Sequence, residues 1–534
     1  MSGFPLSNLT SVAPMLIVIL FAMIVLMVDL VLPKDRKSPL VGISIIGLLL
    51  AAGVAASLWG KGVTGFGGTV VADDFSLMFQ LILIVVAALS ILLSERYIQE
   101  KGINFGEYYA LLLFSTSGAM LMATSQELIT IFVGLEVLSI ALYILSGFAR
   151  TEPRSEESAM KYFLLGSFSS AFFLYGIALI YGGTGVMNAA YAPDGVPAAL
   201  AAYQHVGTTR LDLLVNTQVT NPDAFSSPIV IAGFAMLLIG LGFKAALVPF
   251  HSWTPDVYEG APTSVTAFMS AGAKAGAFAV LVRVAASFLQ VNEYFETALV
   301  VLAVLTMFVG NAVAVLQTNI KRMLAYSSIA HAGYILVGLL AQNEEGHAGI
   351  LFYVLAYTFM NLGAFGILIL LSRRGDEIVR IEDLRGLAKK NPGIAALMAL
   401  FMLSLGGIPP TAGFMGKVFL FLGAVHANLI GLAVFGVLAS VIGAFYYLRV
   451  IWSMFFDEPS REYPANWRSF SPLATVAVAI CAIATLVFGI MPSGLYDATV
   501  VGAKSLPQTQ SAVAPQPAAA PVAALPVTGT TPTP

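Results

Sequence analysis

The chain has little charge and almost no cysteine. Only 10% of its 534 residues are charged, whereas 58% are hydrophobic. Because a soluble domain carries roughly 25% charged residues, this composition cannot cover a surface that faces water. The single cysteine, Cys481, cannot form an internal disulfide, a zinc site or an iron–sulfur cluster. It lies in an apolar run, where we interpret it as a small packing residue.

Histidine is also sparse, and the sequence has no nucleotide-binding motif. The five histidines are scattered and do not provide the paired helical ligands of a membrane cytochrome. The net charge of -3, without a basic stripe, gives no indication of nucleic-acid binding. We therefore predict that this chain binds no metal and no cofactor, and that any redox coupling comes from partner subunits.

Long apolar runs take the place of charge. A helix needs about 20 apolar residues to cross the hydrocarbon core of a lipid bilayer. Fourteen runs meet this need, so we predict an all-α, polytopic membrane protein. The expected spans are 11–32, 40–59, 75–94, 106–124, 127–148, 158–182, 228–250, 262–288, 295–316, 322–341, 348–371, 393–408 with 411–426, 428–455 and 472–491.

The two ends of the chain differ from these spans. The first ten residues contain no Lys or Arg and a full-length span follows, which argues against a cleavable signal peptide. Residues 505–534 are rich in Pro and Ala, have no helical period, and are expected to be a disordered tail.

Lysine and arginine gather in alternate loops. The odd-numbered loops hold 17 of them, whereas the even-numbered loops and the tail hold only Lys61, Arg210 and Lys504. Since cytoplasmic loops are enriched in Lys and Arg, we predict that the odd loops are cytoplasmic and that both termini lie outside.

Spans 7 and 12 contain prolines at membrane depth. The seventh runs through Val248-Pro249-Phe250-His251, and the twelfth through Gly406-Gly407-Ile408-Pro409-Pro410. Proline removes a backbone donor and clashes one turn back, so both helices should be interrupted. The breaks lie five spans apart, which predicts inverted repeats of spans 4–8 and 9–13. We accordingly expect segments 1–105, 106–290, 291–455, 456–504 and 505–534.

Seven ionisable residues lie within or near the apolar spans. A charge at a helix centre costs about 2.5–3.5 kcal/mol on insertion scales, which favours interior, functional positions. Burial raises the pKa of a carboxylate and lowers the pKa of a lysine, whereas pairing the two groups has the opposite effects. A carboxylate that is paired with a lysine could therefore exchange that partner for a proton. The candidates for such a proton relay are Glu136, Lys244, Lys274 and Lys417, with Lys161, His251 and His331 as possible members.

Each candidate also has a structural alternative. Glu136 and Lys244 could form a static ion pair, and Lys274 and Lys417 could extend to the membrane surface. His251 and His331 could serve as hydrogen-bonding links between helices rather than as relays. Lys161 is equally compatible with an interfacial anchor.

Several of these residues lie in motifs of a known family. The run Pro255-Asp256-Val257-Tyr258-Glu259-Gly260-Ala261-Pro262, together with Gly242 to Thr254 before it, resembles the signature of the antiporter-like membrane subunits of respiratory complex I. The family is also similar to subunits of multisubunit sodium/proton antiporters and membrane-bound hydrogenases. The runs around Glu136 and Lys161, and Gly413-Phe414-Met415-Gly416-Lys417, most resemble its subunit N branch. The related subunit M typically has glutamate at the position of Lys417.

This resemblance implies a function that the residues alone do not. It matches the family's proton-channel glutamate and lysines to Glu136, Lys244, Lys274 and Lys417. It implies a complex in the bacterial inner membrane that oxidises NADH and reduces quinone in other subunits. FMN and iron–sulfur clusters would belong to those subunits, and subunit M and small membrane subunits would be neighbours. A cation/proton antiporter, a membrane-bound hydrogenase and a purely structural scaffold remain alternatives.

Overall fold

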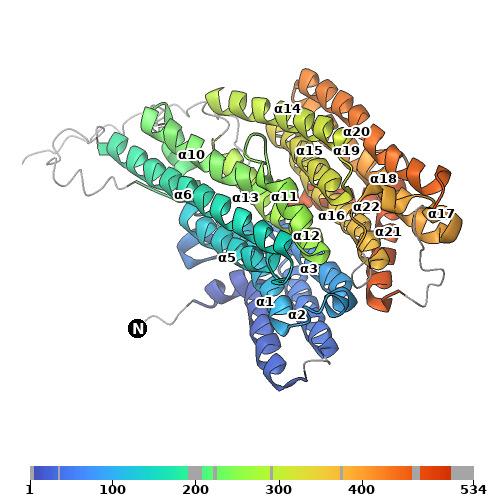
Figure 1. The fold of residues 1–534 in the computed structure, drawn as a ribbon. Coiled ribbons are helices and arrows are strands. Elements are labelled where there is room, and N and C mark those ends of the chain that lie inside the picture. Colours follow the sequence, from blue (N-terminus) through green and yellow to red (C-terminus); the bar gives the residue numbers. More distant parts are fainter. Residues whose placement is uncertain are drawn as a thin grey trace, which may run out of the picture.

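The computed structural model describes residues 5–33, 37–189, 207–220, 225–288, 293–372, 377–459 and 470–506 (Figure 1). Twelve helices in these ranges are long and apolar enough to cross a membrane. Adding α4 (Gly106–Thr124) and the interrupted pair α18 (Pro392–Gly406) and α19 (Ala412–His426) gives the fourteen predicted spans. The predicted fold class, an all-α polytopic membrane protein, is confirmed.

Some residues used in the predictions lie outside the described ranges. They are the tail from residue 507 onward and the basic loop residues Lys34, Arg36, Arg373, Arg374, Arg461 and Arg468.

The chain begins with three spans and a small hairpin. The spans are α1 (Leu6–Val31), α2 (Ser38–Ser57) and α3 (Asp74–Glu100). Between α2 and α3, strands β1 (Val63–Gly65) and β2 (Val70–Ala72) pair antiparallel across the turn η1 (Phe66–Gly68), with Val63 opposite Ala72. The sequence analysis did not predict this hairpin, because its strands are only three residues long.

The next five spans form the first group. They are α4, α5 (Leu128–Ser146), α6 (Pro153–Ala189), α10 (Pro228–Ala245) continued by α11 (Trp253–Gly260), and the helix formed by α12 (Thr263–Phe268), η2 (Met269–Ala273) and α13 (Lys274–Phe288). A shorter helix, α8 (Leu211–Thr220), precedes α10. The η2 turn is a π-helix, a form common at functional sites, and it ends directly before Lys274.

The second group repeats this layout. Its spans are α14 (Glu293–Leu316), α15 (Ile320–Ala341), α16 (Glu344–Leu371), the pair α18 and α19, and α20 (Ile430–Phe456). The short turns η3 (Ile381–Leu384) and α17 (Leu387–Lys390) precede α18, and α21 (Pro472–Ile490) and α22 (Ser493–Lys504) end the described chain. In both groups the interrupted span is the fourth of five.

The most enclosed spans lie where the two groups meet. All residues in the apolar windows of α12–α13 and α16 are buried, and 94% of those in α15. In α1 and α21 only 33% are buried, which leaves most of their apolar surface for lipid or partner subunits. In Figure 1 the helices α12, α13, α15 and α16 accordingly lie between the N-terminal and C-terminal ends of the molecule. Lys274 and His331 therefore belong to the core of the protein.

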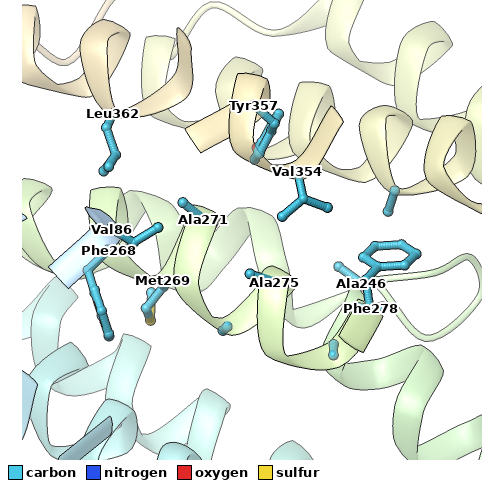
Figure 2. Close-up of a cluster of buried hydrophobic side chains, with 14 of the residues drawn as sticks. Val86, Ala246, Phe268, Met269, Ala271, Ala275, Phe278, Val354, Tyr357 and Leu362 are labelled. Atoms are coloured by element: carbon cyan, nitrogen blue, oxygen red, sulfur yellow. The ribbon is translucent and has the colours of Figure 1, made fainter. Parts of the chain in front are cut away.

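Apolar side chains pack tightly around the π-turn. Figure 2 shows the cluster in which α16 faces α12 and α13, with α3 beside them, through Val86, Phe268, Met269, Ala271, Ala275, Val354, Tyr357 and Leu362. A side chain at Gly272 would place its Cβ 3.3 Å from Val86 of α3. The small residues before Lys274 thus allow a close approach of helices.

Candidate functional site

The predicted interruption of span 7 is confirmed, and its backbone forms a helix C-cap. Helix α10 ends before Ala246, which has a left-handed φ of 61°. The amide of Ala246 donates to the carbonyl of Phe243 (3.1 Å) and that of Leu247 to the carbonyl of Gly242 (2.7 Å), which is a Schellman pattern. The indole of Trp253 also donates to the Phe243 carbonyl, at 3.0 Å. The polar groups released by the break are therefore satisfied inside the protein.

The interruption of span 12 has the same backbone. Helix α18 ends before Gly407, whose φ is 79°. The amide of Gly407 donates to Ser404 and that of Ile408 to Leu403, both at 3.0 Å. A Cβ at Gly407 would also lie 2.9 Å from Cδ of Lys417, so glycine is needed both for the backbone angle and for the space.

Lys244 occupies the last turn of α10, just before the first break. Its side chain is buried, and its ammonium donates to the hydroxyls of Ser139 (2.8 Å) and Tyr162 (3.2 Å). The same ammonium lies 5.4 Å from the centre of the Tyr162 ring. Lys244 is thus held by α5 and α6 through groups that can both accept and donate a proton.

The static ion pair of Lys244 with Glu136, the structural alternative, is not seen among the described residues. No ion pair between them occurs in the described chain, because Ser139, one turn after Glu136 on α5, takes the place beside the ammonium. Glu136 still lies within electrostatic range of Lys244 and Tyr143. Its buried Oε1 has no hydrogen-bond partner among the described residues. A carboxylate so placed requires a further partner such as water.

Lys274 links the two groups of spans. It is buried with 4% of its surface exposed, which excludes extension to the membrane surface. Its ammonium donates to the carbonyl and to the hydroxyl of Ser328 in α15, the latter at 2.6 Å. It also lies 5.1 Å from the centre of the Tyr357 ring of α16.

His331 lies on α15, one turn after the Ser328 that Lys274 contacts. Its Nδ1 lies 2.6 Å from the hydroxyl of Tyr353 and its Nε2 lies 3.1 Å from that of Tyr447. Both Lys274 and Lys417 are within electrostatic range of the ring. With both nitrogens hydrogen-bonded, the imidazole can accept a proton on one side and release it on the other.

Lys417 lies after the second break and is also buried. Its ammonium donates to the backbone carbonyls of Gly406 (3.1 Å) and Leu405 (3.4 Å) at the end of α18. It lies 4.7 Å from the centre of the Tyr334 ring. Ser328, His331 and Tyr334 are spaced three residues apart on α15, so one face of this helix runs from Lys274 to Lys417.

We refer to Lys244, Lys274 and Lys417 as the intramembrane lysines. Within the described ranges, none of them forms an ion pair with a carboxylate, and each donates hydrogen bonds only to hydroxyls or carbonyls beside an aromatic ring. Burying a cation in this way is costly, so its position indicates a role beyond fold stability.

Lys161 lies apart from the intramembrane lysines. It is 41% exposed and bonds to Glu157 and Asp256, each at 2.7 Å. These residues line a hollow of about 160 Å³ with Glu259 and Arg322. Burial raises the pKa of Asp256, but the bonds from Lys161 and Arg322 outweigh it and the pKa is lowered. The ion pairs of Asp256 and Glu259 with Arg322 hold α11 against α15.

His251 follows the first break but does not join this row. It is half-buried, its Nδ1 has no partner among the described residues, and its ring centre lies 6.5 Å from that of Tyr326. The ring of Tyr162, whose hydroxyl accepts from Lys244, is stacked on that of Trp253 with 4.5 Å between the ring centres. The roles of His251 and Lys161 stay predictions.

The sequence analysis missed a buried arginine. Arg283 of α13 donates to Asp73 (2.6 Å) and to the carbonyl of Ala123 (2.9 Å), and it lies 5.1 Å from the centre of the Phe75 ring. Its side chain is 1% exposed. It fastens the end of the first group to α3 and α4. Its position in an apolar run was the available signal.

The geometry can be compared with known proteins. Residues 125–192 and 196–443 match the family model described as "NADH:quinone oxidoreductase/Mrp antiporter, TM". The NADH-quinone oxidoreductase subunit N of Trichlorobacter lovleyi is 44% identical over 491 residues, which cover 92% of this chain and 96% of that protein.

Solved structures give the same result. A chain of respiratory complex I from Thermus thermophilus with bound aureothin is 34% identical with a TM-score of 0.72, over 92% of this chain and all of that one. A chain of the Mrp complex from Dietzia is 21% identical with a TM-score of 0.74, over 94% of this chain and 98% of that one, which indicates a common fold. This chain therefore belongs to the family of NADH:quinone oxidoreductase and Mrp antiporter membrane subunits.

Proposed function

We propose that this chain is a proton-translocating membrane-arm subunit of an NADH:quinone oxidoreductase. The observation that carries the proposal is the burial of the intramembrane lysines, which have no carboxylate partner among the described residues. Lys274 donates to Ser328, and His331 lies one turn further on α15, within electrostatic range of Lys274 and Lys417. The names of the 44% and 34% identical relatives support the assignment to this complex. Electron transfer from NADH to quinone would take place in other subunits.

The proposed path crosses the protein in the plane of the membrane. Glu136 and Lys244 form its first part, with Ser139 as the hydroxyl between α5 and α10. The second part follows one face of α15, from Lys274 past His331 to Lys417. Water molecules would bridge the gaps between these groups, and each lysine would accept a proton from one side before it releases one to the other.

Lysine suits this relay because its charge depends on its surroundings. When the site is dry, burial disfavours the ammonium, and when water or a negative group approaches, the ammonium is favoured. A change of hydration or of charge at one lysine therefore alters proton binding at the next. Arginine could not act in this way because it stays protonated.

We propose the following setting for the chain. FMN, iron–sulfur clusters, NADH and quinone would belong to other subunits, and subunit M and small membrane subunits would be its neighbours. The membrane would be the bacterial inner membrane, with both termini on the outer side. The asymmetry of Lys and Arg between odd and even loops supports this orientation.

A cation/proton antiporter subunit is the second candidate, and the fold shared with the Mrp complex favours it. Co-purification separates the two candidates. A subunit of the oxidoreductase is recovered with a flavin and iron–sulfur clusters in partner proteins, whereas an antiporter subunit is recovered without them.

The variant Lys244→Ala tests the proposed relay in the intact complex. We expect NADH-driven proton pumping to fall far more than the amount of assembled complex, and Glu136→Gln to act in the same direction. Lys61→Ala, which changes an exposed lysine in an even loop, is the matched control and should pump normally. Normal pumping by both relay variants would instead support a purely structural role for these charges.

A further inference from the structure

Helix α3 carries polar groups that the relay does not use. Tyr97, Ser94 and Ser90 lie three to four residues apart and so share one face of this helix. All three are buried, in a span of which 78% of the window is enclosed. Buried hydroxyls at this spacing are often links between helices, so their partners decide what they can do.

The first partners lie on the side of the membrane that carries the basic loops. The hydroxyl of Tyr97 donates to Glu377 (2.8 Å) and accepts from the amide of Thr263 (3.0 Å). Glu377 also pairs with Lys101 at 2.9 Å, and Lys101 with Glu152 at 2.6 Å. Burial raises the pKa of Glu377, but Lys321 and Lys101 outweigh it and lower the pKa. This cluster therefore presents an ionised carboxylate at the membrane surface.

Three further hydroxyls lie one helical turn inward from this cluster, and no hydrogen bond among the described residues joins them to Tyr97. One turn deeper than Tyr97, Ser94 lies 2.8 Å from the hydroxyl of Tyr108, which donates to Ser264 at 2.8 Å. Ser264 follows Thr263, so Tyr97 reaches the start of α12 directly and Ser94 reaches it through Tyr108. Ser94 also donates to the carbonyl of Ser90, so a proton can pass along the three hydroxyls when Ser94 turns from that carbonyl to Tyr108.

The start of α12 leads on to Lys274. Ser270 lies six residues after Ser264, or about 9 Å along the helix axis, and Lys274 lies one turn further. Asn361 of α16 donates to the hydroxyl of Ser270. Between Ser270 and Lys274 the π-turn widens the helix, a feature common where helices carry functional groups.

Two buried atoms along this line have no partner among the described residues. They are the hydroxyl of Ser90, one turn deeper than Ser94, and Oδ1 of Asn361, beside Ser270. Both residues are fully buried. An unsatisfied buried polar atom destabilises the fold, so ordered water is the expected partner for each.

We propose that Tyr97, Ser94, Tyr108 and Ser264 form a proton-uptake branch from the Glu377–Lys101 cluster to Lys274. This inference rests on the proposed function, because it assumes that Lys274 takes part in proton transfer. Water beside Ser90, Asn361 and Ser270 completes the branch. The branch runs along α3, α4 and α12, away from Glu136 and Lys244. It thus gives the second part of the relay its own access to the side of the membrane that carries the basic loops.

The double variant Tyr108→Phe/Ser264→Ala tests the branch in the intact complex. It removes two hydroxyls, keeps the buried ring of Tyr108 and leaves the intramembrane lysines in place. The readout is the number of protons moved per NADH oxidised in proteoliposomes, which a purely structural effect on assembly does not change. We expect a loss at least half as large as that of Lys274→Ala measured alongside.

Tyr109→Phe is the matched control. Tyr109 is the adjacent buried tyrosine of α4 and lies outside the hydroxyl chain, so this variant should pump normally. If the double variant assembles poorly, Ser94→Ala is compared with Ser44→Ala, a buried serine of α2 that bonds only to its own helix.

The outcomes separate this inference from the proposed function. Normal proton transfer in the hydroxyl variants, together with a loss in Lys274→Ala, would overturn the branch and leave the relay intact. Normal proton transfer in Lys274→Ala would overturn both.

Discussion

The two broken spans share a backbone but hold their lysines differently. In span 7, Lys244 precedes the break and donates to hydroxyls of α5 and α6. In span 12, Lys417 follows the break and donates to carbonyls of the helix that the break ends. Hydroxyls can pass a proton on, whereas the carbonyl end of a helix only stabilises a positive charge. The same break thus places hydroxyls beside the lysine of one half and carbonyls beside the lysine of the other.

The largest expected effect comes from fixing the charge of each lysine. Lys244→Arg and Lys417→Arg retain a cation but remove its ability to lose a proton. If both lysines transfer protons, transfer through this subunit should fall about 100-fold in each, as for loss of an acid–base group. Proton pumping in proteoliposomes, compared at equal amounts of complex, measures this fall. Normal pumping by Lys417→Arg alone would make the second lysine a structural cation.

Protein stability should respond differently to substitutions at Gly407 and Ala246, the two residues with a left-handed backbone conformation at the breaks. Gly407→Ala adds a Cβ at a positive φ and against Lys417, so we expect a loss of about 1–3 kcal/mol. Ala246→Gly relieves the same backbone angle in span 7 and should stabilise the protein by about 1 kcal/mol. Thermal unfolding of the purified complex measures both. Shifts of the same sign would contradict the equivalence of the two breaks.

A smaller effect is expected from the hydroxyl beside Lys244. Ser139→Ala removes the bond between α5 and the ammonium, and proton transfer should fall about three- to tenfold, the equivalent of one hydrogen bond. Ser146→Ala is the control, because Ser146 is buried on the same helix and bonds to Leu142 and Met269. Equal pumping by the two variants would remove Ser139 from the path.

The smallest effect concerns the charged turn outside the break in span 7. The lowered pKa of Asp256 means that its ion pairs stabilise the protein above its unfolded pKa of about 4. That contribution should be lost as the pH falls through the folded value. Asp256→Asn should therefore lower the melting temperature at pH 6. At acid pH the variant and the unchanged protein should have the same melting temperature. A constant difference at all pH values would contradict this.

Much of this comparison could be predicted from the sequence. Apolar run lengths gave the spans, because a bilayer sets how long each must be. Prolines 249 and 409–410 placed both breaks, because proline cannot continue a helix. The same reasoning could not show how the breaks end, since the left-handed angle at Ala246 depends on the bonds around it.

The partners of the site were harder to predict than its charges. A lysine in an apolar run is visible in the sequence, but Ser139, Tyr162 and Ser328 are ordinary residues until packing brings them to an ammonium. The static Glu136–Lys244 ion pair, given as an alternative, is not seen for this reason, because a serine one helical turn away lies beside the ammonium. Tertiary contacts, not periodicity, decide such pairs.

The central claim is that hydration connects the intramembrane lysines. A map of the assembled complex with resolved water tests it most directly. We expect ordered water between Glu136 and Lys244, and from Lys274 past His331 to Lys417. A continuous dry gap between Lys274 and Lys417, with both ammonium groups bonded only to protein, would contradict the account.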